Sequence, residues 1–314
     1  MATVRAPPQA NPLEDVQILH KAMKGFGSDE KAIISVIAHR MWWQRQAIVQ
    51  GYTASYGDDL YKKLRSELTG NLESAVVTFL MQPAERDAEL LRKALQDGIM
   101  TDDQVLIEII CSRYPNELQS VVYAYKTKYN RDLVADVRST TRGDFERVLV
   151  ACLQSQRPMG PEVDMNRAQY DADALYKAGV GRIGTSEGEF IRIFCTQSSA
   201  QMAAMADVYA RKYGHDIEKV ISKELSGDLK RAFKAIIRSL RNRPYYFAKC
   251  LRKAMKGMGT NDRALIRTLT TRAEFDLAHV AQMFQAKYKK PLAQSVRSET
   301  SGYYRDFLMA IMGE

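Results

Sequence analysis

The sequence contains no long uninterrupted run of apolar residues. Its longest uncharged apolar segments, such as AVVTFLM at 75–81, are far shorter than the roughly 20 residues that a helix needs to cross a bilayer. The opening MATVRAPPQANP lacks the apolar centre that a secretory signal peptide carries. From these two absences we expect a cytoplasmic protein.

Cysteine and histidine are also scarce, and neither is spaced for chemistry. The chain has four cysteines, Cys111, Cys152, Cys195 and Cys250. They form no C-x-x-C pair, so nothing indicates a zinc knuckle or a disulfide framework, and we expect mostly buried, reduced thiols. The histidines form no pair at metal-ligand spacing, and there is no P-loop and no G-x-S-x-G motif. The sequence therefore gives no reason to expect an enzyme.

The chain does have the composition of a globular protein with an excess of positive charge. Of its 314 residues 46% are apolar and 26% are charged, and the net charge is +9. A balance of this kind favours polyanionic partners, either nucleic acid or anionic lipid headgroups, without distinguishing between them.

A fourfold internal repeat organises the chain. The markers Gly25, Arg40, Tyr56 and Gly70 return without internal gaps when the sequence is shifted by 73, 157 or 232 positions. The shifts give Gly98, Arg113, Tyr129 and Gly143, then Arg182, Gln197, Tyr213 and Gly227, then Gly257, Arg272, Tyr288 and Gly302. The predicted segments are a tail at 1–9, repeats at 10–82, 83–156, 169–242 and 243–314, and a linker at 157–168 that contains two prolines and a glycine.

Each repeat has the periodicity of helices and little sign of strands. In LEDVQILHKAMK, at 13–24, apolar residues recur at helical spacing. Ser28, followed by two acidic residues, predicts a helix N-cap, and Gly57 and Gly70 interrupt the remainder of the first repeat. We therefore predict an all-α protein whose four repeats each contain about five helices.

Two loops carry the most informative pattern. KAMKGFGS at 21–28 and KAMKGMGT at 253–260 place two glycines one residue apart after a helical stretch. Glycine permits positive φ angles, so successive carbonyl oxygens can turn outward instead of bonding within a helix. Glu67 follows Gly25 by 42 residues, and Glu299 follows Gly257 by the same interval. Since calcium takes 6 to 8 oxygen ligands in irregular geometry, the pattern predicts sites built from loop carbonyls and one distant carboxylate.

These features resemble the annexins, which are calcium-dependent phospholipid-binding proteins. The resemblance covers about residues 10–314 and rests on the K-G-x-G-[ST] loop, the acid before a Ser/Thr-Gly pair, and the four-copy register. It implies four repeats packed as a curved disc, Ca²⁺ as the cofactor, and anionic phospholipid membranes as the partner. It also implies a cytoplasmic monomer that joins membranes peripherally when calcium rises, with self-association on membranes left open. MATVRAP, IAHR at 37–40 and PAERDAELL at 83–91 resemble plant members more than animal ones.

Carried over position by position, the resemblance implies calcium sites in repeats 1 and 4. The implied ligands are the carbonyls of Met23, Gly25 and Gly27 with the carboxylate of Glu67, and the carbonyls of Met255, Gly257 and Gly259 with the carboxylate of Glu299. The apolar residues inside the loops are expected to contact the membrane; they are Phe26, Met258 and, in repeat 3, Ile183.

The two middle repeats depart from this pattern. Repeat 2 has Met100 in place of the second glycine and Thr140 in place of the acid, so we expect its site to be lost. Repeat 3 has AGVGRIGTSE, which resembles the family's variant loop. The implied ligands there are the carbonyls of Gly179, Arg182 and Gly184 with the carboxylate of Glu224, and whether they bind calcium is left open.

Other functions are kept as alternatives. Peroxidase activity has been suggested for plant-type relatives through a histidine matching His39 and two cysteines, of which Cys111 is present but Ser239 stands at the second position. Nucleotide hydrolysis is a further alternative. The arginines at the ends of the second helices either line an ion-conducting centre or form structural ion pairs.

A basic stretch at 241–256 is the strongest sign of a nucleic-acid partner. It holds six basic residues, three aromatic residues and no acid. Because it spans a repeat junction and opens a helix, a solvated or lipid-facing helix surface explains it better, and we expect no specific nucleic acid.

Overall fold

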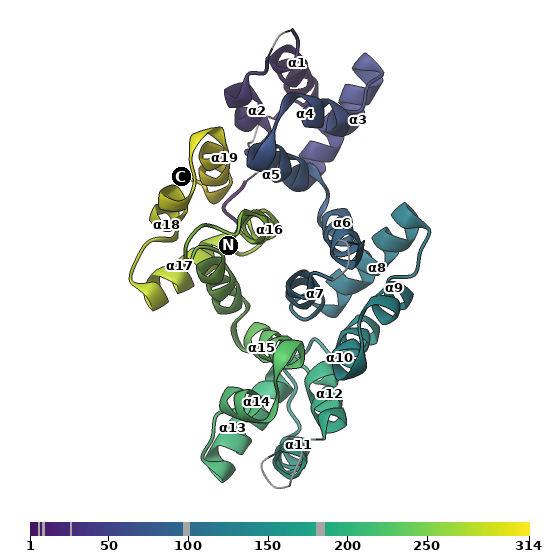
Figure 1. Cartoon of the computed structure of the whole chain (residues 1–314), viewed down its shortest axis with the longest axis vertical. Coiled ribbons are helices and arrows are strands. Elements are labelled where there is room, and N and C mark those ends of the chain that lie inside the picture. The colour runs from purple at the N-terminus through teal and green to yellow at the C-terminus, as the bar shows by residue number, and fades with distance from the viewer. Residues whose placement is uncertain (6, 8–9, 26, 97–100, 180–185) are drawn as a thin grey trace. The chain divides into compact units, whose positions relative to one another are not determined.

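All regular secondary structure in the described part of the chain is helical. The computed structural model describes residues 1–5, 7, 10–25, 27–96, 101–179 and 186–314. These residues form 19 helices (Figure 1), which confirms the all-α prediction. None of these helices is long and apolar enough to span a membrane.

The chain divides into two units, and each is described by itself. Unit 1 comprises residues 1–86 and 244–314, and unit 2 comprises residues 87–243. The helices of unit 1 are α1 (Pro12–Ala22), α2 (Glu30–Ile37), α3 (Trp42–Tyr56), α4 (Leu60–Glu67), α5 (Gly70–Leu80), α16 (Asp262–Arg272), α17 (Leu277–Tyr288), α18 (Leu292–Glu299) and α19 (Gly302–Met312). Those of unit 2 are α7 (Asp103–Ile110), α8 (Pro115–Tyr129), α9 (Leu133–Thr140), α10 (Gly143–Gln154), α11 (Met165–Ala178), α12 (Glu187–Thr196), α13 (Ser199–Tyr213) and α14 (Ile217–Glu224). Helices α6 (Pro83–Gln96) and α15 (Gly227–Ala254) extend across the division.

Helix α15 is two helices joined end to end. Asn242 has φ −160° and ψ 90°, which are not helical angles, and Pro244 follows two residues later. Proline disfavours the helical conformation of the residue before it and lacks an N–H for the helix ladder. When α15 is counted as two, the described helices fall into four groups of five, as the repeat predicts.

The fourfold register is visible in the backbone. The third helix of each group ends on a left-handed residue, at Gly57, Asn130, Gly214 and Lys289, with φ of 66°, 51°, 73° and 58°. The glycines that begin the fifth helices, Gly70, Gly143, Gly227 and Gly302, have φ of 62°, 62°, 55° and 58°. Within each set, the second, third and fourth residues follow the first by 73, 157 and 232 positions, the same shifts that relate the sequence markers. A residue in this region ends a helix by satisfying its last carbonyls, so the same turn recurs at the same place in every copy.

In unit 1, helices from the two ends of the sequence pack together. Helix α5 lies against α16 and α19 (Figure 1). A buried ion pair crosses this junction, since Nη2 of Arg45 lies 2.9 Å from Oε2 of Glu274. The Arg45 guanidinium also stacks 3.9 Å from the ring centroid of Phe79. Loss of one partner would leave the other charge buried and unpaired, so this pair fixes how the first and fourth groups of helices meet.

The N-cap of α2 lies one residue after the predicted position, Ser28. The structure places the cap of α2 at Asp29, whose Oδ1 accepts a hydrogen bond from the N–H of Ala32 at 3.0 Å. Asp102 and Asn261 cap α7 and α16 in the same way. An acidic or amide side chain can accept this bond as well as serine can, which leaves the Ser28 hydroxyl available for another contact.

Candidate metal centres at the interhelical loops

The loop between the first and second helix of each repeat closes on a recurring backbone hydrogen bond. In repeats 1 and 4 the N–H groups of Asp29 and Asn261 donate to the carbonyls of Ala22 and Ala254, both at 2.8 Å. In repeats 2 and 3 the pairs are Asp102 with Ala94 at 3.0 Å and Ser186 with Ala178 at 2.7 Å. The closing step is therefore seven residues in the outer repeats and eight in the middle ones.

The paired glycines of the outer loops have the conformation that their sequence predicts. Gly25 and Gly257 have φ of 102° and 122°. Gly27 and Gly259 have φ of 87° and 90°. A Cβ added at any of these four positions would meet no atom within 4 Å, so the backbone angle, and not lack of space, demands glycine.

These angles release loop carbonyls from the hydrogen bonding of the helices. Within the described backbone, no N–H donates to the carbonyl of Met23, Gly25 or Gly27, and none donates to those of Met255, Gly257 or Gly259. The side chains of Met23 and Met255 are buried and anchor the start of each loop. Each outer loop thus has a short series of carbonyl oxygens that no described backbone N–H occupies, and oxygens of this kind are hard ligands.

The structure brings Glu67 beside the first loop. Oγ of Ser28 donates to the backbone carbonyl of Glu67 at 3.3 Å, across 39 residues of sequence. The Glu67 carboxylate itself pairs with Lys63, one turn earlier on α4, at 2.6 Å. This hydrogen bond raises the pKa of Lys63, so its ammonium stays charged beside the Glu67 carboxylate.

Glu299 lies beside the fourth loop with a different partner. Oγ1 of Thr260 donates to Oε2 of Glu299 at 2.7 Å, so the loop holds the carboxylate directly. The position on α18 that matches Lys63 is Ser295, and its Oγ donates to the Pro291 carbonyl at 3.3 Å. Repeat 4 therefore joins the acid to the loop without a cation at the preceding turn.

Met258 projects from the fourth loop into solvent. Its relative exposure is 106%, the highest among the exposed large apolar side chains. An apolar side chain this exposed at a loop tip is available for burial against another surface. Phe26, the matching residue of repeat 1, lies outside the described residues.

Repeat 2 lacks the acid that the outer repeats supply. Thr140 occupies the matching position, and its hydroxyl donates back to the Asp136 carbonyl at 2.9 Å within α9. Met100, on which the predicted loss of this site also rests, lies outside the described residues, as does Gly98.

Repeat 3 keeps its acid near the loop. A Cβ built on Gly179 would lie 3.1 Å from Cγ of Glu224, so this side chain reaches the point where the loop leaves α11. Arg182, Ile183 and Gly184, the other residues implied for this site, lie outside the described residues.

The recurring arginines are held by carboxylates inside their own units. The pairs are Arg40 with Asp15 at 2.7 Å, Arg113 with Asp87 at 2.7 Å, and Arg272 with Asp276 at 2.6 Å. In repeat 3, Nε2 of Gln197 donates to Asp171 at 2.8 Å, so an amide takes the arginine's place on a matching acid. Of the two alternatives for these arginines, the contacts favour structural ion pairs over an ion-conducting centre.

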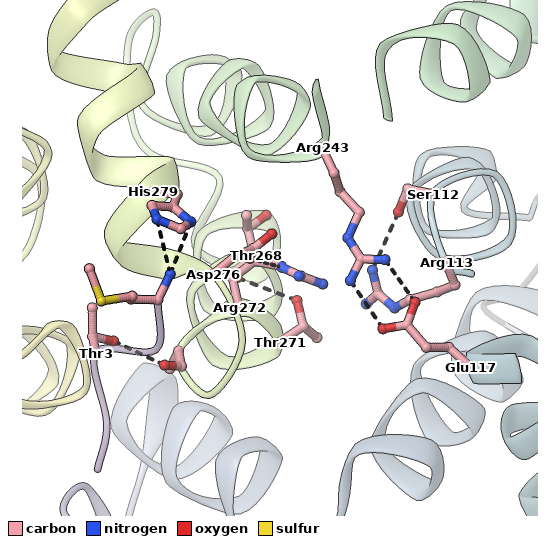
Figure 2. A network of polar contacts seen from close by, with 12 residues as sticks. Thr3, Ser112, Arg113, Glu117, Arg243, Thr268, Thr271, Arg272, Asp276 and His279 are labelled. Carbon is pink, nitrogen blue, oxygen red and sulfur yellow. Dashed lines mark hydrogen bonds and ion pairs between the residues drawn. The ribbon is translucent and has the colours of Figure 1, made fainter. Parts of the chain in front are cut away.

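Two arginines at the start of the basic stretch are also paired. Arg243 binds Glu117 with two hydrogen bonds of 2.8 and 3.0 Å (Figure 2). Arg241 lies 3.0 Å from Asp216. The stretch therefore offers fewer open cations to a polyanion than its sequence suggests.

The described histidines and acidic side chains form no further metal centre. Nδ1 of His39 lies 3.2 Å from the Ser35 carbonyl, as expected for a residue that ends a helix. Among the described residues, no group of three or more His, Cys, Asp or Glu side chains is arranged to hold a metal ion. A carbonyl-rich loop with a single acid is a different type of site, because most of its ligands come from the backbone.

Comparisons with known proteins agree with this architecture. A family model for annexins matches residues 14–79, 86–152, 170–236 and 246–311. Human annexin A7 is 43% identical over 312 residues, which cover 99% of this chain and 64% of that protein. The chain thus spans just under two thirds of that relative's length.

Solved structures of similar proteins extend over the whole chain. Annexin III aligns with a TM-score of 0.97 and 36% identity, covering 100% of this chain and 97% of that one. A calcium-bound annexin (Sm)1 aligns with a TM-score of 0.87 and 31% identity, covering 100% and 93%. The resemblance to plant members stays a prediction. With four matched repeats and this coverage, the chain belongs to the annexin family.

Proposed function

We propose that this chain binds anionic phospholipid membranes when calcium is present, through the loops of repeats 1 and 4. The observation that carries the proposal is the contact between Thr260 and Glu299, which places an acid at a carbonyl-rich loop across 39 residues of sequence. Membership of a family whose solved relatives include a calcium-bound structure supports it. The third repeat is a further candidate because Glu224 lies against Gly179.

The residues present fit calcium better than other ions. Three neutral carbonyls and one carboxylate would supply about five of seven oxygen ligands, which is typical of calcium and poorly suited to zinc or copper. The ligands would be Met23, Gly25, Gly27 and Glu67 in repeat 1, and Met255, Gly257, Gly259 and Glu299 in repeat 4. Bound calcium would supply positive charge and open coordination positions for the phosphate oxygens of lipid headgroups.

Apolar and basic residues would add to the ionic contact. Met258 is already exposed at its loop tip and would lose water-accessible surface in the headgroup region. Phe26 and Ile183 occupy the corresponding positions in repeats 1 and 3. The net charge of +9 attracts the chain to anionic lipid over a range set by ionic strength.

Vesicle sedimentation tests the proposal. The chain should pellet with vesicles of phosphatidylserine and phosphatidylcholine in calcium, stay in the supernatant with phosphatidylcholine alone, and be released by a chelator. The double variant Glu67→Gln, Glu299→Gln should lose most of this binding. A matched double variant with the same charge change, Glu14→Gln with Glu146→Gln, should pellet like the unmodified chain. Binding to anionic vesicles that the chelator leaves intact would reject the calcium mechanism in favour of plain charge attraction.

The cellular setting belongs to the same proposal. We expect a cytoplasmic monomer that becomes a peripheral membrane protein as calcium rises, with a binding role and no primary enzymatic one. Peroxidase activity, nucleotide hydrolysis and ion conduction stay alternatives. Haem absorbance, nucleotide turnover and conductance across a planar bilayer would each detect one of them in the purified protein.

A further inference from the structure

Three of the four cysteines gather at one place inside unit 2. Sγ of Cys152, on α10, lies 3.7 Å from Sγ of Cys195, on α12, although 43 residues separate them. Cys111, which ends α7, interacts electrostatically with Cys152. All three side chains are buried, and all are free thiols. The cluster results from packing, because α10 contacts both α7 and α12 (Figure 1).

A cavity lies beside two of the three cysteines. It has a volume of about 200 Å³ and is lined by Cys111, Cys152, Arg157 and Ser239, among others. Cys195 is not among its lining residues. The space is large enough for a few water-sized molecules. A small solute in the cavity therefore lies beside Cys152, and Sγ of Cys195 lies 3.7 Å from Sγ of Cys152.

The surroundings single out Cys152 as the nucleophile. Hydrogen bonding with Cys111 and Cys195 lowers the pKa of Cys152, and the charge of Arg157 acts in the same direction. The pKa of Cys195 is raised, first by its hydrogen bond with Cys152 and then by burial. A thiolate beside a cation is the reactive form of cysteine, whereas a neutral thiol is a slow attacker but a competent second partner.

Arg157 and Ser155 are fixed against α12. Nη2 of Arg157 donates to the Phe194 carbonyl at 2.6 Å. Oγ of Ser155 donates to the Cys195 carbonyl at 2.6 Å. The cation is therefore fixed beside the cavity that Cys111 and Cys152 also line, with its position set by the end of the helix that carries Cys195.

We propose that Cys152 and Cys195 form a peroxide-sensitive dithiol that closes into a disulfide between α10 and α12. Hydrogen peroxide is the oxidant. The Cys152 thiolate attacks one peroxide oxygen, the O–O bond breaks, and Cys152 sulfenic acid and hydroxide result. The sulfur of Cys195 then attacks the sulfenic sulfur, an S–S bond forms, the S–O bond breaks, and its proton leaves with the hydroxyl as water. Two thiols are oxidised by two electrons, and one peroxide is reduced.

This switch differs from the peroxidase alternative and does not depend on the calcium proposal. The peroxidase alternative uses His39 and positions 111 and 239, where Ser239 donates its hydroxyl hydrogen bond to the Cys111 carbonyl at 3.2 Å and supplies no sulfur. The dithiol uses Cys152 and Cys195 and acts once for each reduction. Its product is a covalent link between α10 of repeat 2 and α12 of repeat 3, within unit 2.

Peptide mapping of the full chain tests the proposal without any substitution. Trypsin places each cysteine on its own peptide, because a lysine or arginine separates every pair. After brief treatment with hydrogen peroxide and alkylation, the main cross-linked product should join the peptides of Cys152 and Cys195, and dithiothreitol should remove it. A Cys111–Cys152 product, or oxidation of half-buried Cys250 before Cys152, would overturn the proposal.

Substitutions separate the roles. Cys195→Ser should stop the reaction at Cys152 sulfenic acid, which dimedone traps, and Cys250→Ser should behave as the unmodified chain. Cys111→Ala should slow the oxidation of Cys152 by roughly tenfold, because the thiolate loses a hydrogen-bond donor. Cys111→Ser keeps a donor and should restore the rate. Equal rates in both Cys111 variants would show that this residue only fills space.

Discussion

The first and fourth loops share a backbone but differ in what holds their acid. Both have two positive-φ glycines and close on a 2.8 Å backbone hydrogen bond. In repeat 4 the Thr260 hydroxyl donates to the Glu299 carboxylate, whereas in repeat 1 the Ser28 hydroxyl donates to the Glu67 backbone and Lys63 takes the carboxylate. The fourth acid is therefore oriented by the loop, and the first by its own helix.

The same spacing between loop and acid therefore does not make the two sites equivalent. A metal ion at the first loop would compete with the Lys63 ammonium for Glu67, while Ser295 brings no charge to the fourth. Removing a competing cation and orienting a ligand in advance both favour binding. We infer that repeat 4 takes calcium more tightly than repeat 1, and substitutions at the loops and their acids test that inequality.

The largest effect is expected from removing the fourth acid. Glu299→Gln should weaken the tighter calcium event by roughly 10- to 100-fold or more, since even outer-shell changes at metal sites cost that much. Glu67→Gln should affect only the weaker event. Calorimetric titration with calcium, in the presence of soluble short-chain phosphatidylserine, resolves the two. If Glu67→Gln removes the tighter event instead, the proposed order of the sites is wrong.

The exposed methionine is expected to have an intermediate effect. Met258→Ser should weaken vesicle binding about fivefold, which corresponds to about 1 kcal/mol of apolar burial lost at the membrane. Calcium binding without lipid should not change, because the side chain is no ligand. Met165→Ser, at an exposed position of α11, serves as the control in vesicle sedimentation. Equal loss in both variants would mean that Met258 does not enter the interface.

The helical repeat and the outer loops were within reach of the sequence, since both depend on local rules. The structure keeps three features that the sequence shows: glycines one residue apart, an acid at a constant distance, and helical periodicity. The Lys63–Glu67 pair is also local, because residues four apart on a helix face each other, and the sequence could have indicated it. The clustering of Cys111, Cys152 and Cys195 could not be predicted from local sequence, because it depends on how three helices pack.

Gln197 is a second residue whose role could not be predicted from the sequence. In the sequence it breaks the series of arginines at the ends of the second helices. In the structure its amide donates to Asp171, the counterpart of the acids that hold Arg40 and Arg113. The feature that these three repeats share is thus a buried carboxylate that accepts hydrogen bonds from an arginine or an amide. The carboxylate lies on a different helix, about 25 residues earlier in the chain, so the position of the donor alone does not identify it.

A smaller effect is expected when the competing cation is removed. Lys63→Ser copies the fourth repeat at this position and should tighten calcium binding at the first loop about twofold. An exposed ion pair between residues four apart typically contributes a free energy of this size. Lys62→Ser removes the same charge from a neighbouring position on α4 and should leave the affinity unchanged. Calcium titration of both variants in the Glu299→Gln background isolates the first site. Equal gains would indicate a general charge effect and not competition for Glu67.

The smallest effect is expected from returning an acid to repeat 2. Thr140→Glu restores the carboxylate, yet we expect no measurable calcium site in the Glu67→Gln, Glu299→Gln background. The loop closes between Ala94 and Asp102 over eight residues, where the outer loops close over seven. Met100 also stands where the outer loops need a second glycine with φ near 90°, which costs other residues roughly 1–2 kcal/mol. Calcium titration checks this, and a new binding event would mean that the acid alone distinguishes an active repeat from a lost one.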